Sequence, residues 1–287
     1  MKLCRFNHSR IGLVERDIVY DITELFNLMP QWPLPQGDWI ISQITPLLPV
    51  IKERGHAMPA ISLASVRLES PVANPGKIIG APINYKAHID EANAAREINY
   101  GKQFTTIEQF GLFIKASSSL IGPSDSVQLR FPDRRSDHEV ELSVIIGREA
   151  RMVKAAEALD YVLGYSIGLD MTVRGPEFPG FRKSVDSYSV LGPWIVTGDE
   201  VGEPDRLDLA IKVNGEVRQR SNTSYLLMKV RELIAYASRF YTLYPGDVIM
   251  TGTPEGVSQV MPGDIMEAEV ERIGTMRIGI ASEWAVE

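Results

Sequence analysis

Cysteine is nearly absent from this sequence. Cys4 is the one cysteine among 287 residues, so the chain cannot form an intramolecular disulfide. Such a composition fits a reducing compartment. Cys4 lies in the short apolar segment that opens the sequence, where we expect a packed side chain of a first strand rather than a nucleophile.

Long apolar runs are absent as well. No stretch approaches the roughly 18 apolar residues that are needed to span a bilayer. The first residues, Met1–Phe6, also lack the apolar core of a signal peptide. We therefore expect a cytoplasmic protein with no membrane contact.

Positive charge is scarce. The chain has 30 lysines and arginines against 37 aspartates and glutamates, with a net charge of −7 and a pI near 5.3. No run rich in lysine or arginine occurs, which argues against binding to a nucleic-acid backbone. A few local cations could still bind a small anion.

The chain is long and apolar enough to bury a substantial core. With 287 residues and 44% hydrophobic content, it can form one large domain or two smaller ones. The segment 71–76, Pro-Val-Ala-Asn-Pro-Gly, is punctuated like a linker. We predict a small N-terminal cap domain over residues 1–70 and a larger, catalytic domain over residues 71–287.

Strand patterns outnumber helix patterns in the chain. A helix capped by Asp38 is expected to extend to Ile51, bent or shortened by Pro46 and Pro49. Other helices are predicted at 84–98, 153–161 and 228–240. Strands are predicted at 2–6, 11–15, 18–21, 111–115, 126–131, 138–147, 163–170, 193–197, 207–213, 247–251, 264–272 and 275–282. This balance indicates a strand-dominated α+β protein.

The most informative segment carries three acids at alternate positions. Asp137, Glu139 and Glu141 lie in an otherwise apolar run, so in a strand they share one face. Burying such carboxylates unpaired costs roughly several kcal/mol, which requires something positive among them. Their oxygen ligands suit Mg²⁺, Mn²⁺ or Ca²⁺ better than zinc. The alternative is an edge strand with a solvated acidic face.

Residues further along the chain favour the metal site. Asp170 ends an apolar segment and can complete a carboxylate cage that begins on another strand. Arg174 and Lys183 follow it. These cations can hold an anionic substrate against the metal, because arginine suits a bidentate carboxylate contact and lysine provides a point charge.

The ordered series of motifs resembles the fumarylacetoacetate hydrolase family from about residue 71 to the end. The blocks that carry the resemblance are His138–Leu142, Leu169–Arg174, Lys183–Ser184, Val213–Gln219 and Pro245–Val257. The resemblance implies a mixed β-sandwich roll that forms a homodimer. It also implies Mg²⁺ or Mn²⁺ bound by Glu139, Glu141 and Asp170, with Lys183 and Thr253 in the substrate pocket.

A further element resembles the lid helix of the acylpyruvase and oxaloacetate decarboxylase type of this family. It reads Asn-Tyr-x-x-His-x-x-Glu over Asn84–Glu91. Residues three apart are neighbours on a helix, so Glu91 can hydrogen-bond His88 and support it as a general base for water. The alternative is a solvated pair on a surface helix. The same resemblance places Tyr85 among the substrate-binding residues.

The chain departs from the family pattern after Arg174. The family type has an Asp and then a Gln there, whereas this chain has Gly175-Pro176-Glu177. Glu177 would therefore favour a substrate hydroxyl or ammonium over a carboxylate. The segment 92–110 is also longer than in the smallest members. Its aromatic residues could close the pocket or simply pack as a surface loop.

One motif points to different chemistry. Gly164–Gly168 matches the Gly-x-Ser-x-Gly elbow of serine hydrolases. That fold requires a histidine after the serine, but all four histidines precede Ser166. We predict that Ser166 is structural.

Together with the family resemblance, these residues predict a metal-dependent hydrolase that cleaves a C–C bond in a β-diketo acid of the acylpyruvate kind. The metal would chelate the 2-oxo-carboxylate or its enolate. His88 would activate water, while Lys183 and Thr253 would stabilise charge on the carbonyl oxygen or enolate. A decarboxylase or hydratase-like lyase acting on an oxaloacetate-type substrate is the alternative, followed by a catalytically silent scaffold. The expected partner is a small anionic keto acid.

Overall fold

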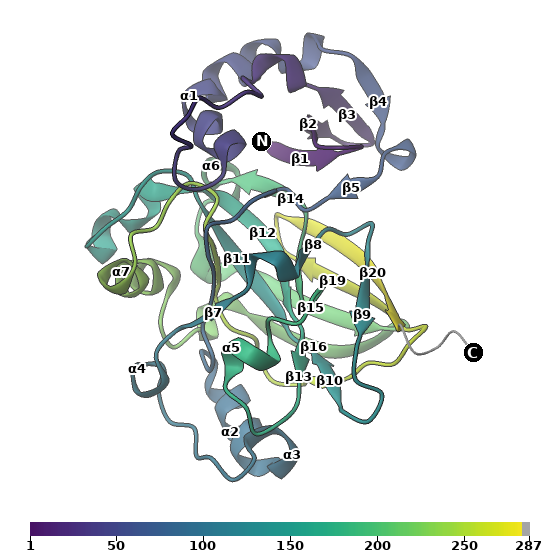
Figure 1. Ribbon diagram of the computed structural model, residues 1–287, viewed down its shortest axis with the longest axis vertical. Helices are drawn as coiled ribbons and strands as arrows, with labels where there is room; N and C mark the ends of the chain where they lie inside the picture. Colours follow the sequence, from purple (N-terminus) through teal and green to yellow (C-terminus); the bar gives the residue numbers. More distant parts are fainter. Residues whose placement is uncertain (283–287) are drawn as a thin grey trace.

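Three β-sheets organise the structure, which is a computed structural model that describes residues 1–282 (Figure 1). The twelve-stranded sheet contains β1 (Lys2–Phe6), β2 (Arg10–Glu15), β3 (Ile18–Asp21), β4 (Ala60–Ser62), β5 (Leu68–Glu69), β6 (Ile78–Gly80), β7 (Phe113–Lys115), β8 (Leu120–Ile121), β11 (Val140–Ile146), β12 (Val162–Asp170), β14 (Ser189–Thr197) and β17 (Val248–Met250). The three-stranded sheet contains β10 (Ser136–His138), β13 (Thr172–Val173) and β18 (Ser258–Gln259). The five-stranded sheet contains β9 (Ser126–Leu129), β15 (Asp208–Val213), β16 (Glu216–Asn222), β19 (Ile265–Val270) and β20 (Gly274–Ser282).

Most helices are short. The two longest, Trp39–Arg54 and Val230–Phe240, contribute buried residues to apolar clusters that also contain residues of the large sheet. The α-helices are α1 (Trp39–Arg54), α2 (Lys86–Ala94), α3 (Arg96–Asn99), α4 (Ile107–Phe110), α5 (Pro179–Arg182), α6 (Gly198–Val201) and α7 (Val230–Phe240). The 3₁₀ helices are η1 (Thr23–Leu25), η2 (Gly55–Ala57), η3 (Leu63–Ser65), η4 (Ser117–Ser119), η5 (Ala155–Tyr161), η6 (Pro204–Arg206) and η7 (Thr223–Tyr225). The prediction of a strand-dominated α+β fold is confirmed.

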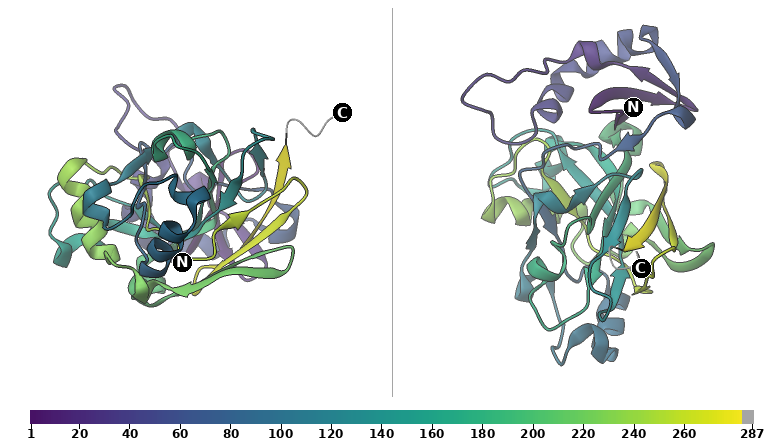
Figure 2. Two further views of the ribbon diagram at one scale, coloured as in Figure 1. Left: turned by 90° about the horizontal axis from the view of Figure 1, so that it is seen from below. Right: turned by 45° about the vertical axis from the view of Figure 1, so that its right-hand side comes forward.

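The large sheet and the five-stranded sheet pack face to face. Leu142 of β11 and Ile167 of β12 share one buried cluster with Ile211 of β15 and Met266 of β19. Every residue of β11 is buried, as expected for a strand at the centre of a layered protein. Most strand pairs are antiparallel, but three are parallel, namely β6 with β17, β8 with β14 and β9 with β20. This is the mixed sandwich that the family resemblance implies (Figure 2).

The N-terminal strands continue the large sheet. Strand β1 pairs with β14, with Leu3 opposite Ile195, and the two side chains join one apolar cluster. The N-terminal elements lie at one end of the molecule and α2 and α3 lie at the other (Figure 1). The domain boundary near residue 70 stays a prediction.

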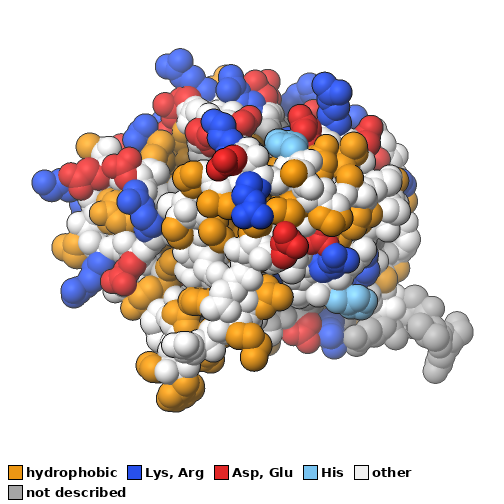
Figure 3. All heavy atoms as spheres, turned by 90° about the horizontal axis from the view of Figure 1, so that it is seen from above, with side chains coloured by type: hydrophobic (Ala, Val, Ile, Leu, Met, Phe, Trp, Pro, Cys, Tyr) orange, Lys and Arg blue, Asp and Glu red, His pale blue; other side chains and the backbone are white. Residues whose placement is uncertain are grey.

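The outer face of the N-terminal region carries exposed apolar side chains (Figure 3). Leu28, Met29, Trp32 and Leu34, in the proline-rich segment before α1, are 52% to 87% exposed. Within residues 1–282, no helix combines the length and the hydropathy that crossing a membrane requires.

Two elements are longer than predicted by three residues or more. Helix α1 continues through Pro46 and Pro49 to Arg54, because its inward face buries Ile41, Ile44 and Ile51, and this packing offsets the backbone hydrogen bonds lost at the prolines. Strand β14 begins at Ser189, four residues before the predicted start, so that Pro193 lies inside the strand and not at its first position.

The register of β12 against β14 shifts between Tyr165 and Ile167, opposite Pro193. A bulge is where a sheet tolerates proline. The Ser166 hydroxyl at this bulge donates to the carbonyl oxygens of Gly192 (3.1 Å) and Trp194 (2.9 Å). The structural interpretation of Ser166 is therefore confirmed.

Two predicted helices differ in form. The helix predicted at 153–161 is the 3₁₀ helix η5. The helix predicted at 84–98 is interrupted at Ala95, whose extended backbone separates α2 from α3.

Candidate active site

Three buried carboxylates converge at one end of the large sheet. Glu139 lies between β10 and β11, Glu141 is the second residue of β11, and Asp170 ends β12. Antiparallel pairing of β11 with β12 places Val140 opposite Leu169, which brings the three acids together. One carboxylate oxygen from each residue lies within 4.8 Å of the others, and the three residues are only 1% to 4% exposed.

A lysine ammonium lies against this triad. Lys183 Nζ, just after α5, donates to Glu139 Oε2 (2.6 Å) and to Asp170 Oδ2 (2.5 Å). Burial opposes the charged form of Glu139, but Lys183 and Arg174 outweigh it and lower the pKa of that carboxyl to about 2. The two carboxylates in turn raise the pKa of the Lys183 ammonium, again against the effect of burial. The positive charge predicted among the acids is present.

Glu141 is the uncompensated member of the triad. Its Oε2 accepts a hydrogen bond from the backbone N–H of Gly252 (2.6 Å), and it forms no ion pair within residues 1–282. Burial, followed by the charges of Asp170 and Glu139, raises the pKa of Glu141 well above its usual value. A divalent cation would relieve this repulsion, and an all-oxygen donor set is the type that Mg²⁺ and Mn²⁺ take. The residues therefore fit such an ion.

Asp137 does not belong to the triad. The acids do not lie on one continuous strand, because β10 and β11 are separate strands in different sheets. Asp137 instead accepts from Arg135 Nε (2.6 Å) and from Arg174 Nε (2.8 Å). Arg174 also donates to Glu139 Oε1 (3.1 Å). In this structure Arg174 thus orients a metal-ligand candidate, and its guanidinium is already paired.

The predicted lid dyad is formed. His88 Nδ1 on α2 lies 3.0 Å from Glu91 Oε2, and Glu91 Oε1 accepts from the backbone N–H of Gly256 (2.9 Å). His88 is only 4% exposed, which excludes the alternative of a solvated surface pair. Glu91 therefore ties the lid to the loop that carries Gly252 and Thr253.

Tyr85 and Thr253 differ in their freedom to bind a ligand. The Tyr85 hydroxyl is buried and has no hydrogen-bond partner among the described residues. Burial and the charge of Glu141 raise its pKa. The Thr253 hydroxyl instead donates to the carbonyl oxygen of Val140 (3.0 Å) and accepts from Gln219 Nε2 (2.8 Å). Substrate contacts by these residues stay predictions, and Tyr85 has the open donor.

Glu177 is held at the rim of the site. Its two carboxylate oxygens accept from the two terminal nitrogens of Arg134, at 3.1 and 2.9 Å. It is paired with a cation in this structure, and a contact to a substrate hydroxyl or ammonium stays a prediction.

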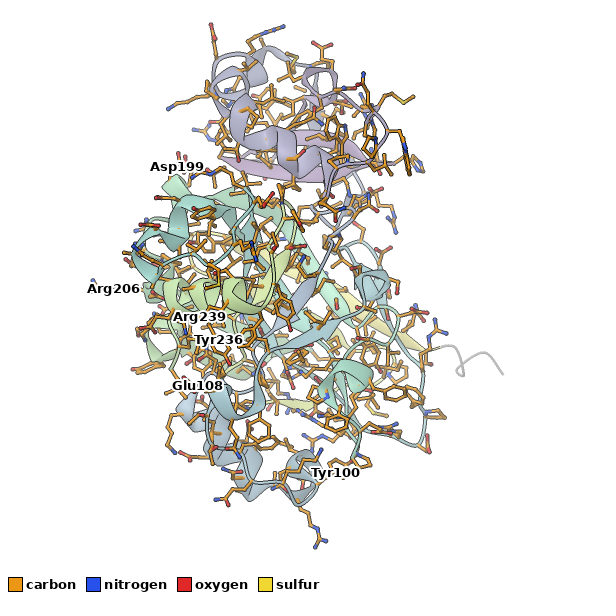
Figure 4. The ribbon with its side chains drawn as sticks, turned by 60° about the vertical axis from the view of Figure 1, so that its left-hand side comes forward. Tyr100, Glu108, Asp199, Arg206, Tyr236 and Arg239 are labelled. Carbon is orange, nitrogen blue, oxygen red and sulfur yellow. The ribbon has the colours of Figure 1, made fainter. Side chains whose placement is uncertain are left out.

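The segment 92–110 is a largely exposed stretch with a few packed side chains. Phe104 and Phe110 contact each other with ring centroids 5.3 Å apart, and Phe104 packs against the cluster that contains Ile98. Tyr100 lies exposed at the foot of the molecule, and Glu108 of α4 lies towards Tyr236 and Arg239 of α7, with which it lines one cavity (Figure 4). The surface-loop interpretation fits these contacts.

Sequence reasoning missed two buried polar residues of the site. Lys115, the last residue of β7, is ion-paired with Asp170 Oδ1 and donates to the carbonyl oxygen of Tyr188 (2.7 Å). Gln219 of β16 accepts from the backbone N–H of Val140 (3.1 Å). Lys115 comes at the end of an apolar strand pattern and belongs to no recognisable motif, so the sequence offered no signal for it. Gln219 is the last residue of the family-like block Val213–Gln219, and this position was the signal that could have identified it.

The chain is similar to a known protein family and to several of its members. A family model described as "Fumarylacetoacetate (FAA) hydrolase C-terminal" matches residues 77–281. A maleylpyruvate hydrolase of Aquipseudomonas alcaligenes is 56% identical over 286 residues, which cover 98% of this chain and all of the relative. A mitochondrial oxaloacetate tautomerase of Rattus norvegicus is 34% identical, with 96% of this chain and 90% of the relative covered.

Solved structures agree. A crystal structure of maleylpyruvate hydrolase from Sphingobium sp. SYK-6, in complex with manganese(II) and pyruvate, aligns with a TM-score of 0.84 and 38% identity. The alignment covers 98% of this chain and 99% of that one. The chain belongs to the fumarylacetoacetate hydrolase family.

Proposed function

We propose that this protein is a metal-dependent hydrolase that cleaves acylpyruvates, breaking the C–C bond between the acyl carbonyl carbon and the methylene carbon. The observation that carries the proposal is a buried carboxylate triad with the His88–Glu91 pair close by, since the His88 imidazole is among the groups whose charge acts on Glu139. A hydrolase that acts through an enolate needs both a cation site and a base for water. The maleylpyruvate hydrolase relative supports this class of substrate.

A divalent cation held by Glu139, Glu141 and Asp170 would supply Lewis-acid stabilisation at the 2-oxo acid end of the substrate. His88, oriented by Glu91, takes a proton from water, and the resulting hydroxide adds to the acyl carbonyl carbon. The C–C bond then breaks, and its electron pair passes to the methylene carbon, which takes up a proton. The products are pyruvate and a carboxylic acid.

Lys183 supplies positive charge to the reacting region. Because Glu139 and Asp170 keep it protonated, its ammonium can donate to an oxygen on which negative charge develops. The open hydroxyl of Tyr85 adds a further donor.

The metal is proposed as Mg²⁺ or Mn²⁺. The manganese complex of the Sphingobium relative supports Mn²⁺, and an oxygen-only donor set also suits Mg²⁺. We further propose a small anionic keto acid as the partner, a cytoplasmic location and a homodimer.

A second candidate is a 2-oxo-acid decarboxylase or hydratase-like lyase. The oxaloacetate tautomerase relative favours oxaloacetate as a substrate for the same carboxylate triad. Such a reaction needs no hydrolytic water, so the His88–Glu91 pair would have no role in activating one.

A substrate panel separates the two candidates. The enzyme is assayed with acylpyruvates and oxaloacetate, each with Mg²⁺ and with Mn²⁺, and the products are identified by mass. The proposal predicts metal-dependent release of pyruvate and a carboxylic acid. CO₂ from oxaloacetate without acylpyruvate cleavage would select the lyase, and no turnover of any substrate would contradict both.

A further inference from the structure

One buried cation near the triad has no acidic partner. Four cationic side chains in residues 1–282 are buried, namely Lys115, Arg174, Arg182 and Lys183. The three others pair with Asp170, Asp137 or Glu139 at hydrogen-bond distance. Arg182, 9% exposed, forms no ion pair with any carboxylate that the structure describes.

The Arg182 guanidinium is oriented by backbone carbonyl groups. At the end of α5, its Nε donates to the carbonyl oxygen of Glu177 (2.9 Å) and its Nη1 to that of Val173 in β13 (3.4 Å). No described group accepts from Nη2. A planar guanidinium that is held through Nε and Nη1, with donors left over, is suited to a carboxylate from outside the chain.

The surroundings make this charge costly when it is alone. Burial and the nearby Arg174 guanidinium lower the pKa of Arg182, while Glu139 and Asp170 act in the opposite direction. The group therefore lies within the electrostatic reach of the metal triad. It is also the residue immediately before Lys183, whose ammonium contacts that triad. A ligand anion would supply the missing negative charge.

We propose that Arg182 is a specificity-determining residue that binds a second carboxylate, at the far end of the acyl arm of the substrate. The inference rests on the proposed acylpyruvate hydrolase function. The substrate class is thereby narrowed to acylpyruvates whose acyl arm is itself an acid. The rim pair Arg134 and Glu177 does not compete for this role, because the two side chains neutralise each other.

The test compares succinylpyruvate with the amide of its distal carboxyl group, which has the same length but no second charge. Wild type is expected to favour succinylpyruvate in kcat/KM. R182Q should lose this preference by on the order of tenfold to a hundredfold, the usual effect of a hydrogen bond to a charged group. The change should appear in KM for succinylpyruvate, with little effect on the amide.

Controls separate this role from a structural one. R54Q removes a surface arginine of α1 and should keep the wild-type preference. If R182Q does not fold, R182K carries the test: it keeps the charge without the planar fork, and KM should rise at least about threefold for succinylpyruvate alone. Equal effects on both substrates, or a wild type without preference, would overturn the role of Arg182. A wild type that cleaves neither compound would instead contradict the proposed function.

Discussion

Glu141 and Lys183 are two buried residues of the site with opposite charges and different surroundings. Glu141 is buried among like charges with a single backbone N–H as its donor, whereas Lys183 is buried between two carboxylates. Among the described residues, Glu141 has no cation paired with it, whereas Lys183 is itself a cation paired with Glu139 and Asp170. Their substitution should therefore affect metal binding in different ways.

Replacing Glu141 with alanine should weaken Mg²⁺ binding by about tenfold or more, on the order of 1.4 kcal/mol or above, because a ligand and its charge are removed together. Activity should fall in parallel. Calorimetric titration of the variant measures the change, and E149A, at an exposed acid in the turn after β11, serves as the control. An unchanged affinity in E141A would remove Glu141 from the site.

Replacing Lys183 with methionine should abolish turnover and leave Mg²⁺ bound. The ammonium is not a metal ligand, and its loss makes the triad more negative, so affinity should be retained or increased. Steady-state kinetics and calorimetry on the same preparation test this pair of outcomes. Normal turnover, or a protein that fails to fold, would instead make Lys183 a structural ion-pair partner.

At the scale of elements, Glu91 connects the lid helix α2 to a loop of the site. Glu91 contacts His88 with one oxygen and the Gly256 backbone N–H with the other. The carboxylate therefore has two tasks, to orient the imidazole and to hold α2 against the loop after β17. An amide at this position can accept through one atom only.

His88→Ala should reduce acylpyruvate cleavage by about 10²–10⁴-fold, the usual range for general-base assistance, with less effect on any oxaloacetate decarboxylation. Glu91→Gln should also reduce cleavage, because either the imidazole or the loop loses its acceptor. Rates for both substrates at saturating Mg²⁺ measure this difference. If H88A hydrolysed acylpyruvates at the wild-type rate, water activation would be assigned to another group.

The sequence predicted strands and the site residues better than it predicted their connections. The strands at 2–6 and 18–21 and the meeting of Glu139, Glu141 and Asp170 followed from local pattern and family resemblance. The break at Glu139 could not be foreseen, because the apolar alternation runs unbroken through it. Lys115 was missed because its partner Asp170 lies 55 residues away in sequence, beyond the reach of any local pattern.

At the scale of the whole molecule, the N-terminal strands and the body share one sheet and one apolar cluster. Leu3 and Ile195 pair across the junction between β1 and β14. Elements that share a buried interface of this kind are expected to unfold together. The single cysteine, on β1, offers a direct probe of this coupling.

Cys4 should react with Ellman's reagent only when the whole protein unfolds. Burial raises the pKa of its thiol to about 12, so at about pH 8 almost no thiolate is present in the folded state. As denaturant is added, thiol reactivity and circular dichroism should show the same midpoint. Reactivity that appears at a lower denaturant concentration would indicate that the N-terminal region opens independently.

The central claim is that the site adds water across a C–C bond, and isotope tracing tests it most directly. Purified enzyme with Mn²⁺ is given an acylpyruvate in heavy-oxygen water, and the products are analysed by mass at early times. The account predicts one heavy oxygen in the released carboxylic acid, with the reaction lost after chelation of the metal and strongly reduced in H88A. Cleavage without label in that acid, or at an equal rate without metal, would contradict it.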